Sequence, residues 1–143
     1  MQKINFQNLP STTTPVNATN LNQLQTNVEN EFNVGSWTNL TLLNNFIAYT
    51  GQNTPQYRRI GKCVYLRGVI KTSVDVTTST RTIATLPFTT TQYTNTYYPC
   101  VMVTSSTRVA DQIQFTKTGD LLAPRTMTTT DWIPLDGIVI VLD

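Results

Sequence analysis

The stretch YRRIGKCVYLRGVIK, residues 57–71, decides the fold. Two runs of β-forming residues flank Gly61-Lys62, and glycine at the first central position of a two-residue loop suits a type II′ hairpin turn, because that position needs a positive φ. After the turn, the side chains alternate between a face with Val64, Leu66 and Ile70 and a face with Cys63, Tyr65, Arg67 and Val69. Both faces are mostly apolar, which predicts a central strand covered on its second face by another sheet or by a neighbouring subunit.

The composition points to an all-β protein. The 143 residues suffice for one domain and an extension. Only 13% of them are charged, whereas 28 are threonine, a residue that favours strands. The net charge of +2 is too small and too scattered to predict binding to nucleic acid or to a membrane.

Several kinds of chemistry are excluded or unsupported. The chain has no histidine and two cysteines, which removes His-dependent nucleophilic sites, His-ligated metals and a four-ligand cysteine zinc site. Only Asp131 and Asp136 share a loop, so no local motif suggests paired-carboxylate catalysis. We therefore expect no enzyme and no cofactor. Cys63 and Cys100 fall in strand-like runs and are interpreted as small buried hydrophobes in a reducing compartment, with a disulfide as the alternative.

The first 35 residues differ from the rest. A polar, proline-containing arm leads to Asn17, a plausible N-cap, and Gly35 ends the pattern that follows. The helix between them has one apolar stripe, formed by Leu21, Leu24, Val28 and Phe32. The stripe packs either on the chain's own β-domain or in a short parallel coiled coil between copies, and the second interpretation is favoured. No segment has the length of a membrane span or the apolar core of a signal peptide, so we expect synthesis in a cytoplasm.

Residues 36–143 contain about eight short strands separated by turns. This pattern predicts a β-sandwich, jelly-roll-like head, with 1–35 as a separate arm and helix. The closing run DWIPLDGIVIVLD, residues 131–143, is expected to form one strand buried on both faces. A single sandwich core cannot cover the second apolar faces of the central and final strands, so we expect them to lie between protomers. The sequence alone does not choose between two copies and three.

Several phrases in fixed order carry a resemblance. They are WTNLTLLNNFIAY at 37–49, YRRIGKCVYLRG at 57–68, TIATLP at 82–87, IQFTKTGDL at 113–121 and WIPLDGI at 132–138, preceded by the leader INFQNLPSTTTPVNATNLN at 4–22. Together they resemble receptor-binding and minor structural proteins of the baseplate or tail tip of phages that infect Gram-positive bacteria. The resemblance spans nearly the whole chain and includes no catalytic motif.

The resemblance implies a homotrimer in the virion, at the tail tip or baseplate, made in the host bacterial cytoplasm. Residues 1–35 would attach to other baseplate or tail proteins, and the head would bind a host cell-wall saccharide. A structural adaptor without receptor binding is the alternative. Nucleic acid and membrane insertion are not expected.

Candidate site residues follow from the chemistry of sugar binding, which needs aromatic faces and polar groups that fix hydroxyls. The ligand-binding candidates are Tyr93, Tyr97, Tyr98, Arg108 and Asp111. Trp132 is interpreted as a packing residue. The candidates for the oligomer interface are the helix stripe (Leu21, Leu24, Val28 and Phe32) together with Tyr65 and Arg67.

Overall fold

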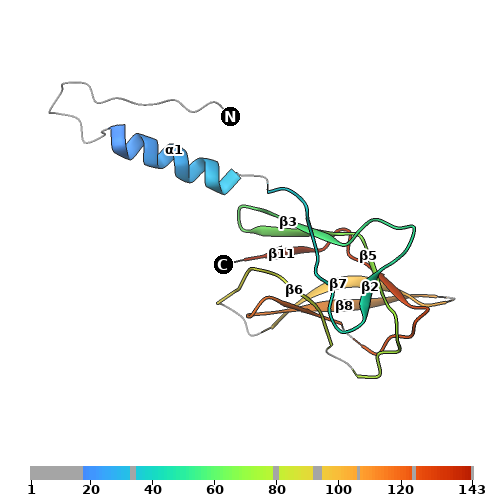
Figure 1. Cartoon of the computed structure of the whole chain (residues 1–143). Helices are drawn as coiled ribbons and strands as arrows, with labels where there is room; N and C mark the ends of the chain where they lie inside the picture. Colours follow the sequence, from blue (N-terminus) through green and yellow to red (C-terminus); the bar gives the residue numbers. More distant parts are fainter. Residues whose placement is uncertain are drawn as a thin grey trace.

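The computed structural model describes residues 18–32, 35–78, 81–91, 95–105, 107–123 and 125–142. These residues form one helix and eleven strands arranged in two antiparallel sheets (Figure 1), which confirms the all-β sandwich with an N-terminal helix. The helix is α1 (Ala18–Phe32). The four-stranded sheet has the order β1 (Thr38–Asn39), β3 (Gln56–Ile60), β4 (Cys63–Arg67) and β11 (Val139–Val141). The seven-stranded sheet has the order β2 (Phe46–Ala48), β5 (Val69–Thr72), β10 (Trp132–Pro134), β7 (Asn95–Val103), β8 (Arg108–Thr116), β9 (Asp120–Leu122) and β6 (Thr82–Thr85).

The core lies between the two sheets. Val64 and Leu66 enter it from the four-stranded sheet, and Ile70, Ile113 and Ile133 enter it from the seven-stranded sheet. All five side chains are almost completely buried. Burial of one such aliphatic side chain contributes about 1.5–3 kcal/mol, so a core of this kind stabilises the sandwich without a disulfide.

The hairpin of residues 57–71 forms as predicted. Ile60 pairs with Cys63 across the two-residue loop, and Gly61 has φ +56°. Lys62 has a negative φ, because Asn44 and Asn45 are the only described non-glycine residues with positive φ, and this combination fits a type II′ turn. β4 lies between β3 and β11, so the expectation of a central strand is correct.

The prediction of one continuous strand after this turn is wrong. Gly68, with φ +95°, separates β4 from β5, and the two strands belong to different sheets. A Cβ atom at position 68 would overlap the carbonyl group of Thr54 and lie 2.7 Å from the Cα of Pro55. Val69 is consequently buried in the seven-stranded sheet and does not share a face with Tyr65. Only glycine accommodates both the left-handed backbone and the close approach.

The closing run is also divided, contrary to expectation. A turn at Asp136-Gly137, where Gly137 has φ +89°, places β10 in one sheet and β11 in the other. Ile140 is fully buried, but Val141 is 62% exposed, so within this chain the run is buried on one face only. The apolar run therefore forms two short strands, because its first part belongs to the seven-stranded sheet and its last part to the four-stranded sheet.

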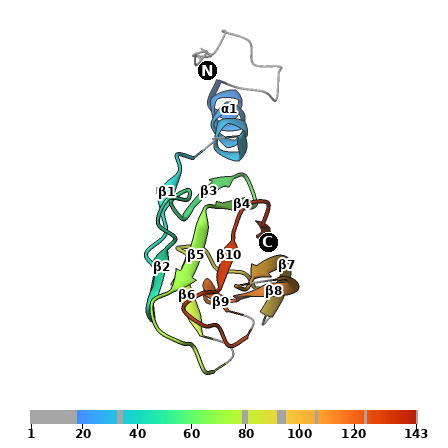
Figure 2. The ribbon, with the colours of Figure 1, turned by 90° about the vertical axis from the view of Figure 1, so that its right-hand side faces the viewer.

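Helix α1 stands away from the sandwich, on the side of the four-stranded sheet (Figures 1 and 2). It falls between the predicted helix ends at Asn17 and Gly35, although Asn17 itself lies outside the described residues. Leu24 is 59% exposed and Val28 is 43% exposed, so these stripe residues are not covered by the β-domain. Leu21 is half-buried, and the side chain of Phe32 lies outside the described part of the chain. Within the described residues, no helix is long and apolar enough to cross a membrane.

Replacing Gly68 with alanine should destabilise the fold by about 3 kcal/mol or more, because a strained φ is combined with a backbone clash. The matched control is Gly51→Ala. Gly51 has φ +82°, but nothing lies within 4 Å of an added Cβ, so the strain alone should cost about 1 kcal/mol. Urea unfolding of both variants measures the two losses in the free energy of unfolding. Equal losses would contradict the role given to the close approach of Gly68 to Thr54 and Pro55.

Candidate functional site

One row of side chains crosses the outer face of the seven-stranded sheet. Residues that face each other across antiparallel strands lie on the same side of a sheet. The register pairs Ile47 with Lys71, Lys71 with Trp132 and Trp132 with Val103, and Val103 pairs with Arg108. The sequence neighbours Ile70 and Ile133 are fully buried in the core, so the row points outward.

Two aromatic rings meet on this face. The ring centroids of Tyr49 and Trp132 are 5.7 Å apart, with 47° between the ring planes. Lys71 Nζ lies 5.5 Å from the centre of the Tyr49 ring. Tyr49 directly follows β2, and its backbone N–H donates to the carbonyl of Val69 at 3.0 Å, which holds it against β5. Both aromatic side chains are half-buried and keep an accessible surface, which we call the Tyr49–Trp132 platform.

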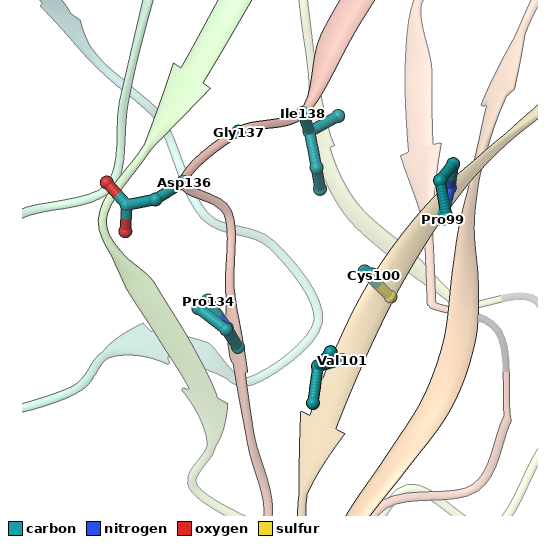
Figure 3. Close-up of a pocket in the computed structure, with 7 residues that line it drawn as sticks. All are labelled: Pro99, Cys100, Val101, Pro134, Asp136, Gly137 and Ile138. Atoms are coloured by element: carbon teal, nitrogen blue, oxygen red, sulfur yellow. The ribbon is translucent and has the colours of Figure 1, made fainter.

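A cleft opens between β10 and β7, two residues along each strand from the Trp132–Val103 pair, and Figure 3 shows the residues that line it. β10 and β7 pair only at Trp132 and Val103. Beyond that pair the strands separate at Pro134 and Pro99, two residues that have no N–H to offer to a ladder. The resulting cleft has a volume of about 270 Å³ and is lined by Pro99, Cys100, Val101, Pro134, Asp136, Gly137 and Ile138.

The cleft is mainly apolar. Pro99 and Val101 lie on its β7 side, and Pro134 lies on its β10 side (Figure 3). Among the described residues that line it, Asp136 is the only charged one, and its carboxylate points away from Pro99 and Val101. Val101 remains 40% exposed, so the cleft opens to solvent. A molecule bound in the cleft would therefore find its polar partners mainly in the backbone or in side chains at the rim.

Two of the sequence-predicted site residues lie on this outer face, but far from each other. Tyr97 is 54% exposed and pairs with Gln114, whereas Arg108 is exposed and pairs with Val103. Tyr97 and Val103 are six residues apart along β7, a distance of about 20 Å in a strand. Tyr97 and Arg108 therefore cannot contact the same small group of a ligand.

Tyr98 and Asp111 lie on the inner side of the same hairpin. Tyr98 packs against the core, and burial raises its pKa, an effect opposed by a hydrogen bond with the backbone of Val141. The Asp111 side chain is 9% exposed and forms an ion pair with Arg125 Nε. Tyr93 lies outside the described residues.

Cys100 faces Asp111 across the hairpin. The pKa of the Cys100 thiol is raised to about 11, first by burial and second by the Asp111 carboxylate, while Arg125 and a hydrogen bond to the backbone of Ile113 oppose the shift. Cys63 and Cys100 are both free and half-buried, so the disulfide alternative is wrong. The described residues contain no group of three or more His, Cys, Asp or Glu side chains that could hold a metal ion.

A second aromatic cluster lies on the outer face of the four-stranded sheet. The guanidinium carbons of Arg58 and Arg67 lie 4.6 Å and 4.0 Å from the ring centre of Trp37. Arg58 also lies 5.9 Å from the ring centre of Tyr65, and Arg67 Nε donates to Gln56 Oε1 at 2.8 Å. Tyr65 and Arg67, the predicted interface residues, thus belong to this cluster. Their strand, β4, lies in the sheet nearest to α1 (Figure 2).

Sequence reasoning missed Tyr49, Lys71 and the cleft. Each depends on pairings between segments far apart in the chain, such as Lys71 with Trp132. Trp132 does pack, as interpreted, but its partner is Tyr49 at the surface. The one local signal was the period of two of an extended strand over residues 97–103, which places Tyr97, Pro99 and Val101 on the same face.

Comparison with known proteins identifies the fold. No protein-family model and no curated protein matches the chain. Among solved structures, the chain shares its fold with a receptor-binding protein of a tailed phage of a Gram-positive host. That neighbour is the receptor binding protein (gp15) of Listeria phage PSA, with a TM-score of 0.62 and 18% sequence identity over 87% of this chain and 74% of the neighbour. The likeness agrees with the resemblance seen in the sequence, and at this identity it establishes the fold.

The Cys100 thiol should react slowly with iodoacetamide. With a pKa of about 11, only about one thiol in a thousand is ionised at pH 8, and the thiolate is the nucleophile. The alkylation rate should rise about tenfold per pH unit below pH 11. Because the Asp111 carboxylate raises the pKa, Asp111→Asn should speed the reaction, whereas Asp136→Asn, which removes an exposed carboxylate, should not. Mass spectrometry of the Cys100 peptide measures both rates, and equal rates in the two variants would refute the assigned cause.

Proposed function

We propose that this protein is a phage receptor-binding protein that attaches the virion to a saccharide on the host cell surface. The single observation that carries the proposal is the fold shared with a phage receptor binding protein over 87% of the chain. The phrases spread along the sequence support the same class of protein independently. A purely structural adaptor would need no ligand platform, and none of the observed features favours it.

The outer face of the seven-stranded sheet supplies the chemistry that saccharide binding needs. Sugar rings present apolar C–H faces that stack on aromatic side chains, and their hydroxyls need a few fixed polar partners. The Tyr49–Trp132 platform offers the aromatic surface, and Lys71 lies beside it as a hydrogen-bond donor. This combination supports a binding role for the face, in place of the pure packing role that the sequence suggested for Trp132.

We further propose that the protein acts as a homotrimer at the tail tip or baseplate, with residues 1–35 directed to the virion. Support comes from the exposed Leu24 and Val28, since a helix stripe left uncovered by its own domain suits a coiled coil. The Trp37 cluster and the exposed Val141 add a second partly apolar surface on the outer face of the four-stranded sheet. Both surfaces lie on the α1 side, so assembly there leaves the platform on the opposite sheet free (Figure 2).

A fluorescent fusion of the full chain should bind intact cells of one or more strains in a panel of Gram-positive bacteria that includes Listeria. Periodate oxidation of the cell-wall glycans should abolish binding, and protease treatment of the cells should not. Trp132→Ala should weaken binding about tenfold or more, because a central aromatic contact dominates a small interface. Lys62→Ala, in the exposed turn of the hairpin, is the control that should bind normally. Binding to no strain would support the adaptor alternative.

Light scattering should give the full chain three times the mass of one protomer. The double variant Leu24→Asn, Val28→Asn should lower the mass to that of a monomer, because it removes the exposed apolar stripe. The control Gln23→Ala, Asn27→Ala changes two exposed polar positions of the same helix and should remain trimeric. A monomeric wild type, or a double variant that stays trimeric, would argue against the helix as the assembly element.

A further inference from the structure

We infer that the cleft between β7 and β10 binds the methyl-terminated substituent of a saccharide, either an N-acetyl group or the methyl group of a 6-deoxy sugar. The inference rests on the proposed saccharide-binding function and names the class of sugar and its subsite. It depends on the shape and polarity of the cleft and on its position beside the Tyr49–Trp132 platform.

The polarity of the cleft selects the substituent. Its described walls are formed by the side chains of Pro99, Cys100, Val101, Pro134 and Ile138. The carboxylate of Asp136 points away from Pro99 and Val101 (Figure 3). A hydroxyl group buried among these residues would lose its water and could gain only the weakly polar Cys100 thiol as a side-chain partner, which is unfavourable. A methyl group has no hydrogen bonds with water to lose, and it gains apolar contact. The cleft therefore favours a methyl-bearing sugar.

The position of the cleft fits a ring bound at the platform. Trp132 faces Val103, and Val101 follows two residues further along β7, about 7 Å away. Pro134 stands in the same relation to Trp132 along β10. A sugar stacked on the platform can therefore direct a substituent into the cleft while its ring remains at the surface.

The same outer face continues beyond the cleft and offers room for more than one sugar. Gln112 pairs with Pro99, and Gln114 pairs with the exposed Tyr97. These amides carry both donors and acceptors for hydroxyl groups. The face from Trp132 to Tyr97 is about 20 Å long, which matches an oligosaccharide better than a single ring.

The test compares sugars that differ only in the substituent, using ligand-observed NMR on the full chain. The two pairs are N-acetylglucosamine with D-glucose and L-rhamnose with L-mannose. One methyl-bearing sugar should bind at least about tenfold more tightly than its partner, with the strongest saturation transfer at its methyl group. The pair that shows the preference distinguishes the N-acetyl from the 6-deoxy substituent. Equal binding within both pairs would overturn the inference.

A matched pair of valine variants locates the site. Val101→Asp places a charge in the cleft at a position that is already 40% exposed, and it should reduce binding at least about tenfold. Val74→Asp makes the same change at a 45% exposed valine outside the cleft and should have no effect. Equal effects, or none, would refute the subsite. If the protein binds cells but none of these sugars, the subsite fails while the proposed function stands; if it binds no cells, the proposed function fails.

Discussion

At Gly68 the backbone leaves the four-stranded sheet and enters the seven-stranded sheet within one residue, and both sheets depend on this passage. The carbonyl of Gly68 accepts a hydrogen bond from the N–H of Leu135 at 2.8 Å, so the crossing also fixes the chain between β10 and β11. That second segment crosses between the sheets beside the first. Two crossings at one place tie the sheets together covalently and set the register in which β5 meets β10.

That register in turn creates the outer face. With Lys71 opposite Trp132, the tyrosine that follows β2 reaches the indole ring, and the prolines at positions 99 and 134 end the pairing of β7 with β10. The cleft is therefore a product of strand pairing that stops early. Because two prolines cause the separation, the opening is part of the folded backbone and does not require a conformational change.

Local signals in the sequence predicted the local features correctly. The Gly61-Lys62 turn and the helix between Asn17 and Gly35 each depend on neighbouring residues only. The division of residues 63–71 and 132–141 between two sheets was missed, since a glycine within an apolar run looks the same in one strand as at the boundary of two. Tyr49 and Lys71 carried no signal of their own, because long-range pairing alone brings them to Trp132. The inward direction of Asp111 was hidden for a related reason: its partner, Arg125, lies beyond the next strand.

The Trp37 cluster has a mechanical consequence. Trp37 follows α1 after a short connection, and the N–H of Gly35 donates to the carbonyl of Arg59 at 3.1 Å. A pull applied through the helix would reach the sandwich first at these residues. There two guanidinium groups, one from each strand of the central hairpin, lie over the indole ring. The force would thus be distributed over β3 and β4, the two middle strands of the four-stranded sheet. The two-residue strand β1 would not have to resist it alone.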